Sequence, residues 1–121
     1  MAKDPKQLKV WQLADRLVMT VYRATTYLPS EERYGLTSQM RRAAVSVVAN
    51  VSEGAGRRTQ QDFLHFLYMA SASLNELEYY IHLIRQLDYV PVDITARLAQ
   101  QRKETARTLQ GLISKIEEDL P

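Results

Sequence analysis

Residues 39–54 decide the fold, and they read Gln39-Met40-Arg41-Arg42-Ala43-Ala44-Val45-Ser46-Val47-Val48-Ala49-Asn50-Val51-Ser52-Glu53-Gly54. Apolar side chains recur here at steps of three and four residues, the spacing of one face of an α-helix; they are Met40, Ala43, Ala44, Val47 and Val51. Many of the other side chains are small, which lets a second helix approach closely. Gly54 and Gly56 follow, and glycine ends helices because it adopts the left-handed conformation at least cost. The stretch therefore predicts a helix that packs within an assembly and stops near Gly54.

A polar line runs beside the apolar one at the same helical spacing; its members are Arg42, Ser46, Asn50 and Glu53. Ser73 and Glu76 form a second line further along the chain. Because an unpaired buried charge costs several kcal/mol, we predict an internal network in which Arg42 faces Glu76 and Asn50 bonds to the next helix. The alternative is that these residues occupy partly exposed positions and do not pair.

Composition excludes several classes of protein. A chain of 121 residues is long enough for one domain with a real core. It has no cysteine, so disulfides, cysteine nucleophiles and thiolate metal sites are excluded. The net charge of +2 is a mild basic excess, which by itself argues only weakly for a nucleic-acid partner. No signal peptide and no apolar run of about 20 residues is visible, so we expect a cytoplasmic protein without a membrane span.

Helical periodicity covers nearly the whole chain, and no strand-like alternation interrupts it. We expect four helices at about residues 7–27, 36–54, 59–87 and 91–118 within one domain, 1–121. Asp4 and Pro5 suit the start of the first helix, Thr59 is a good N-cap, and Pro91 fits the first turn of the fourth. Amphipathic helices joined by short loops predict an all-α protein, an up-down-up-down four-helix bundle.

The segment 59–87 has two seams at heptad spacing. The first is Phe63, Leu67, Ala70, Leu74, Leu77, Ile81 and Ile84, and the second is Phe66, Met69, Ser73, Glu76, Tyr80, Leu83 and Leu87. One bundle core needs only one such seam, and surplus apolar surface usually marks an interface. The second seam therefore predicts self-association.

No residue pattern points to catalysis. His65 and His82 do not fall on the line of Ser46, Ser73 or Glu76, and they do not form the paired Glu-x-x-His motif of di-metal bundles. No glycine-rich phosphate loop follows a strand. We expect a protein that is not an enzyme, with no catalytic residue, metal or cofactor.

Arginines supply a hypothesis for binding. Arg33, Arg41, Arg57 and Arg58 are expected to cluster around one end of the bundle, where copies in an oligomer would bind RNA or DNA together. The alternative is that they are ordinary surface residues, some of them favouring a helix dipole. A second hypothesis is a protein-interaction scaffold that uses exposed tyrosines, among them Tyr34 and Tyr79.

Several segments resemble one bacterial family, the four-helix-bundle proteins encoded by intervening sequences in 23S rRNA genes. The segments are Val10-Trp11-Gln12-Leu13-Ala14, residues 34–54, Asp62-Phe63 and residues 70–78. The resemblance implies a left-handed four-helix bundle that assembles as a ring-like homopentamer. It also implies kinship with accessory proteins of diversity-generating retroelements, which bind a reverse transcriptase and nucleic acid. It supplies no catalytic residue.

Overall fold

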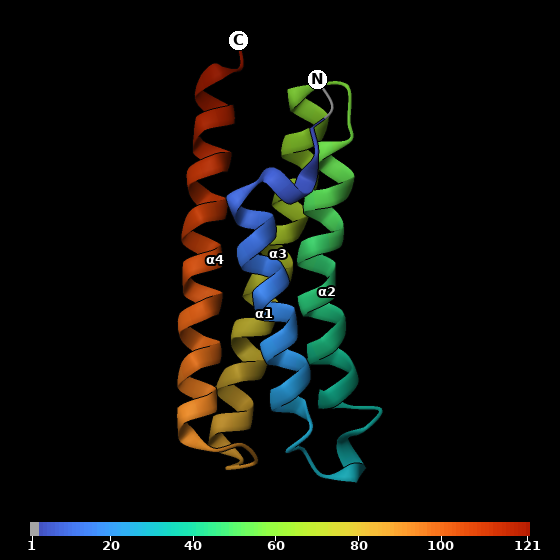
Figure 1. Ribbon diagram of the computed structural model, residues 1–121, viewed down its shortest axis with the longest axis vertical. Helices are drawn as coiled ribbons and strands as arrows, with labels where there is room; N and C mark the ends of the chain where they lie inside the picture. Colours follow the sequence, from blue (N-terminus) through green and yellow to red (C-terminus); the bar gives the residue numbers. More distant parts are fainter. Residues whose placement is uncertain (1–2) are drawn as a thin grey trace.

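The computed structural model describes residues 3–121 and contains four long helices that lie side by side (Figure 1). No strand occurs within this range. The long helices are α1 (Lys9–Thr25), α2 (Leu36–Ala55), α3 (Gln60–Gln86) and α4 (Val92–Asp119), and two short 3-10 helices are η1 (Pro5–Gln7) and η2 (Ser30–Glu32). The expectation of an all-α, four-helix fold is confirmed, and each long helix begins and ends within two residues of its expected bounds.

Successive helices run in opposite directions along the bundle (Figure 1). Contacts join α1 to α2, α2 to α3, α3 to α4 and α4 back to α1, whereas α1–α3 and α2–α4 are diagonal pairs. The four helices thus occupy the corners of a square in cross-section. The side formed by α2 and α3 is therefore opposite the side formed by α1 and α4, and a molecule bound to one of these sides leaves the other free.

The core is built from the apolar stripes that periodicity predicts. Every member of the first seam of α3, from Phe63 to Ile84, is buried. Met40, Val47 and Val51 of α2 are fully enclosed beside it. In α4 the chain buries Ile113, whereas its neighbour Leu112 is only partly buried. None of the helices in residues 3–121 is both long and apolar enough to cross a membrane.

The helix starts show which capping signals operate. Thr59 Oγ1 accepts a hydrogen bond of 3.1 Å from the Asp62 amide, as expected of an N-cap. Asp4 caps the separate turn η1, and Leu8 then interrupts the helix with an extended backbone, so α1 begins at Lys9, two residues after the expected start near Gln7. Pro91 lies at the N-cap of α4, one residue before the first turn.

The end of α2 differs from the expectation. Gly56 is its C-cap, but the backbone of Gly56 is right-handed (φ −84°), so no left-handed glycine ends this helix. The carbonyl of Ala55 instead accepts a 2.8 Å hydrogen bond from the Lys3 amide. Gly54 is buried against α3: a Cβ atom there would lie 2.8 Å from Phe63 Cδ1 and 2.9 Å from Phe66 Cβ. Gly54 therefore allows α3 to approach, and does not act as a stop.

Candidate functional site

The α2–α3 side of the bundle carries an open hollow of about 900 Å³. Its lining includes the small side chains Ala43, Ser46 and Ala49 of α2 and Ser73 of α3. The hollow also extends to Tyr22 of α1 and to Arg33 and Tyr34 of the α1–α2 connection. The hollow exists because these short side chains leave space where two helix surfaces meet. Val45 next to it is 42% exposed. The small residues of α2 were expected to let a helix pack closely, and Ala43 is indeed buried in the core, whereas Ala49 is exposed in the hollow.

Hydroxyl groups join the two helices at this hollow. Ser73 Oγ donates to Ser46 Oγ at 2.9 Å, so a hydrogen bond links α3 to α2. Asn50 Nδ2 donates to the Ser46 carbonyl at 2.9 Å and to Ser46 Oγ at 3.1 Å. Asn50 was expected to bond to the third helix, and that expectation is wrong. Its short side chain reaches the residue one helical turn earlier, and only Ser46 makes the connection to α3.

The charged members of the predicted network remain at the surface. Arg42 and Glu76 are both exposed and both line the hollow, but within residues 3–121 no ion pair joins them. The expected internal Arg42–Glu76 pair is therefore wrong, because water solvates both groups and a surface pair would contribute little. Glu53 is also exposed, and its carboxylate lies 3.6 Å from Arg57, four residues later in the α2–α3 connection.

Two of the candidate arginines lie where α1 meets the start of α2. Arg41 is held in place: its Nε donates to Thr25 Oγ1 at 2.9 Å, and its guanidinium lies 4.5 Å from the centre of the Tyr22 ring. Arg33 is exposed on the α1–α2 connection, with its guanidinium 5.7 Å from the Tyr34 ring centre. Arg41 therefore fastens α1 to α2, whereas Arg33 is accessible to a ligand.

The other two candidate arginines lie at the opposite end of α2. Arg41 and Arg57 are 16 residues apart, which corresponds to about 24 Å along the helix. Arg57 lies over Phe66 at 4.6 Å from the ring centre, and Arg58 is exposed beside it. The expectation of one cluster around one end is therefore wrong. The four residues form two pairs because the whole of α2 separates the loops that carry them.

Most basic side chains lack an acidic partner. Between residues 3 and 121, only Arg57 and Arg102 form ion pairs within 4.0 Å. The chain has 16 lysines and arginines in all, and 14 acidic residues. Acidic residues are thus numerous, but within residues 3–121 only Glu53 and Glu78 lie within 4.0 Å of a basic group. The surface keeps unneutralised positive charge in specific places, although the net charge is small.

Comparison with known proteins identifies the family. The model of the 23S rRNA-intervening sequence protein family matches residues 6–111. The chain belongs to this family. No curated protein matches the sequence. Among solved structures, a protein of unknown function from the S23 ribosomal protein family of Bacteroides thetaiotaomicron matches with a TM-score of 0.79. It is 21% identical, and the match covers 86% of this chain and 97% of that chain, so the likeness concerns the fold.

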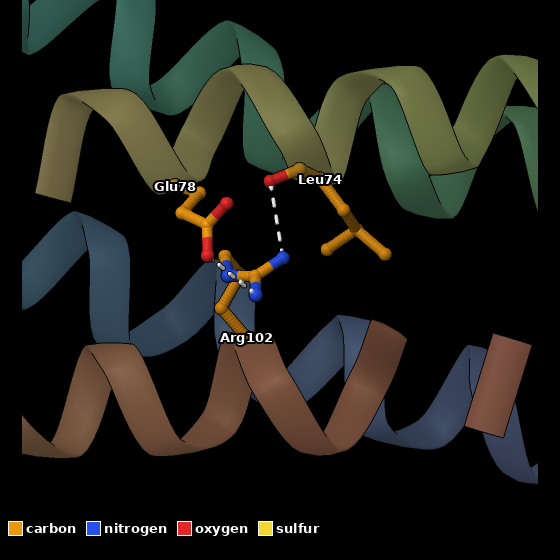
Figure 2. Close-up of polar contacts among 3 residues, drawn as sticks. All are labelled: Leu74, Glu78 and Arg102. Atoms are coloured by element: carbon orange, nitrogen blue, oxygen red, sulfur yellow. Dashed lines mark hydrogen bonds and ion pairs between the residues drawn. The ribbon is translucent and has the colours of Figure 1, made fainter. Parts of the chain in front are cut away.

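Arg102 is a residue of this intervening-sequence protein that sequence reasoning missed. Its side chain is only 12% exposed, lying between α3 and α4 (Figure 2). One guanidinium nitrogen donates to Glu78 Oε2 at 3.1 Å and another to the Leu74 carbonyl at 3.5 Å. The sequence spacing could have indicated that Arg102 is largely buried. Arg102 is four residues after Leu98 and three before Thr105, which are both buried, so it lies on the same face of α4 as these core residues.

Two tyrosines of this family member have perturbed acidity. The hydrogen bond from the Tyr68 hydroxyl to Glu117 raises the pKa of Tyr68 above 10.0, with smaller contributions from burial and from the carboxylate charge. Burial raises the pKa of Tyr80, and the Glu76 carboxylate adds to the effect. A raised folded-state pKa favours the folded protein below pH 10, and the benefit is lost as the pH rises through the raised value. Neither group titrates near neutral pH, so we assign neither an acid–base role.

Proposed function

We propose that this intervening-sequence family protein is a non-enzymatic homo-oligomer that binds nucleic acid through arginines. The observation that carries the proposal is the α2–α3 side, with its hollow of small side chains beside exposed apolar residues. Met69, one turn before Ser73 on α3, is 43% exposed and adds to Val45. Exposed apolar surface beside a hollow suits a protein contact.

Charge complementarity favours a second copy as the occupant of this side. Arg42 and Glu76 both line the hollow and both lack an ion-pair partner within the described part of the chain. A neighbouring copy placed against this side can bring a carboxylate to one and a guanidinium to the other. The family resemblance favours five copies, and because a ring of five has only head-to-tail contacts, the α2–α3 side of one copy then meets a different surface of the next.

Ala49→Arg tests the self-association. Ala49 lines the hollow and is exposed, so an arginine there keeps the helix and the monomer intact but fills the space and adds charge. We expect light scattering to give a mass well above 13.9 kDa for the wild type, about 70 kDa for five copies, and 13.9 kDa for the variant.

Ala96→Arg is the matched control, since Ala96 is an exposed alanine on α4, the helix diagonal to α2. This control should keep the wild-type mass. A wild-type protein that remains monomeric at about 100 μM would contradict the proposal, because assembly depends on protomer concentration.

Nucleic-acid binding is supported by exposed arginines without acidic partners. Arg33, at the end of the hollow beside the α1–α2 connection, and Arg58, at the other end of α2, are exposed, and no ion pair involves them within residues 3–121. Phosphate contacts of single arginines are weak, but linked copies bind a long polyanion together and gain affinity from avidity. Oligomerisation would therefore convert scattered positive charge into a binding surface.

A titration with RNA and with duplex DNA in low salt tests this part. We expect binding that weakens as salt rises, and a double variant, Arg33→Gln with Arg58→Gln, whose logarithmic salt slope falls by about 0.7–0.9 for each phosphate that is no longer neutralised. Arg107→Gln, on the exposed side of α4, is the control. Absence of binding to either nucleic acid at roughly 10 μM protein would refute nucleic-acid binding.

A protein partner is the second candidate, with the chain acting as a cytoplasmic scaffold or an accessory subunit of a reverse transcriptase. Tyr34 favours it, because this ring is 85% exposed on the α1–α2 connection. Exposed tyrosines are enriched at interfaces. Co-purification with a reverse transcriptase from the same host should be lost in Tyr34→Ala, and equal recovery of the two proteins would argue against this surface.

A further inference from the structure

The α1–α4 side of the bundle carries a groove of a different character. Two adjoining hollows, of about 570 and 300 Å³, share Thr20, Arg23 and Arg97 in their linings and are together called the α1–α4 groove. Arg16 lines the larger hollow. Arg16 and Arg23 are seven residues apart on α1, or about 10 Å along its axis. Three arginines from two helices therefore face the same groove.

The positive charge of this groove is not neutralised within the protein. Asp15 is the only acidic residue in the linings of the two hollows. Throughout the described range no ion pair within 4.0 Å involves Arg16, Arg23 or Arg97. Like charges on neighbouring helices repel, and an acidic residue at one of these positions would relieve the repulsion. A local arrangement that works against stability is the kind expected at a binding site.

Apolar and aromatic surface accompanies these arginines. Tyr27 lines the smaller hollow and is 51% exposed, and Met19 lines the larger one and is 50% exposed. A positively charged groove tracks a phosphate backbone, while an aromatic ring provides a platform for a base regardless of sequence. Phosphate alone would need no such platform. The combination fits a single strand whose bases are unpaired.

We propose that the α1–α4 groove binds single-stranded nucleic acid, with Arg16, Arg23 and Arg97 contacting phosphates and Tyr27 stacking on a base. The inference rests on the proposed nucleic-acid binding and locates it on residues other than Arg33 and Arg58. Because this groove is opposite the α2–α3 side, it stays open in an oligomer whose second contact surface is not the α1–α4 side. An oligomer would then present several such grooves to one strand.

Arg97→Glu separates binding from folding. The introduced carboxyl lies in the groove with Arg23 and Arg16, so it relieves repulsion, and we expect thermal stability equal to the wild type or higher. The same change removes one phosphate contact and adds repulsion. Fluorescence anisotropy with labelled 20-nucleotide oligo(U) and oligo(dT) should show at least a tenfold loss of affinity and a salt slope lower by about 0.7 or more.

Arg107→Glu is the matched control, since Arg107 is exposed on α4 and lines neither hollow. It makes the same change in net charge, and we expect its affinity to stay within about twofold of the wild type. Tyr27→Ala should weaken both oligonucleotides without changing the salt slope, because stacking releases no counterions.

The outcomes distinguish the groove from nucleic-acid binding in general. If the wild type binds and both charge reversals weaken it equally, the groove is not the site, although the proposed function stands. The same holds if only the Arg33 and Arg58 variants lose affinity. Tighter binding to duplex than to single strands would overturn the assignment to a single strand. If the wild type binds none of these nucleic acids, the groove and the nucleic-acid proposal both fail.

Discussion

Gly54→Ala should destabilise the protein by about 1–2 kcal/mol, although alanine is the better helix former by about 1 kcal/mol. The added methyl group would lie 2.8 Å from Phe63 Cδ1, 2.9 Å from Phe66 Cβ and 3.2 Å from the Phe63 carbonyl oxygen. The last two atoms cannot move away by a change of side-chain rotamer. The axes of α2 and α3 must therefore separate, and this disturbs packing along their contact. Urea unfolding measures the loss.

Gly111→Ala is the control for this prediction. Gly111 is in α4 and exposed, and a Cβ atom there would have no neighbour within 4 Å. This variant gains helix propensity and loses unfolded-state entropy, so it should be more stable than the wild type by up to about 1 kcal/mol. The two identical substitutions are thus expected to have opposite signs. Equal effects would show that Gly54 is not needed for the approach of α3.

The contrast between these glycines shows what the sequence could not predict. A glycine near the end of a helical stretch has two common uses, a stop and a close approach, and both look the same in one sequence. The choice depends on which side of the helix faces a neighbour. The Cα atom of Gly54 faces Phe63 and Phe66 of α3, and this close approach depends on how α2 and α3 are placed relative to each other.

Periodicity predicted the helices and most of the core because burial repeats along each of them. The first seam of α3 is an example, since all of its members are buried. The partners of charged and polar residues were harder to predict, because they depend on how far each side chain extends and on whether water is available to it. Arg42 and Glu76 line one hollow as their spacing suggested, but water solvates them, and Asn50 bonds to its own helix. Arg33 and Arg57 were expected to lie at the same end of the bundle, because both are in loops next to α2. The 20 residues of α2 separate those two loops, so the arginines lie at opposite ends.

Arg102→Glu should destabilise the protein more than any charge reversal at an exposed arginine, with a loss of about 3 kcal/mol at pH 8. The side chain is 12% exposed, and it lies between the Glu78 carboxylate and the Leu74 carbonyl (Figure 2). A carboxylate in its place would be desolvated beside another carboxylate and a carbonyl oxygen. Arg85 and Lys103 line the same hollow as the side chain at this position, but neither forms an ion pair with Glu78 within residues 3–121, so Glu78 loses its guanidinium contact and the new charge gains no fixed partner. Thermal unfolding should shift downwards by roughly 10 °C.

The pH dependence tests whether charge causes this loss. Burial and the neighbouring carboxylate both raise the pKa of the introduced carboxyl in the folded state above its unfolded value. Such a group favours folding below its unfolded pKa and opposes it as the pH rises through the folded pKa. The variant should therefore recover part of its stability between pH 8 and pH 5 relative to the wild type. A deficit that is the same at both pH values would attribute the loss to packing.

Two further variants separate the guanidinium from its apolar stem. Arg102→Met keeps most of the stem, and because Glu78 is 65% exposed the broken ion pair should cost only about 1 kcal/mol or less. Arg107→Glu makes the same change as Arg102→Glu at an exposed position of α4 and should stay within about 0.5 kcal/mol of the wild type. If Arg107→Glu lost as much stability as Arg102→Glu, net charge and not the buried site would explain the effect. We expect the loss of stability to be large in Arg102→Glu and small in Arg102→Met and Arg107→Glu. This order would mean that Arg102 links α3 to α4 mainly through its buried apolar stem, while the exposed Glu78 carboxylate compensates its charge.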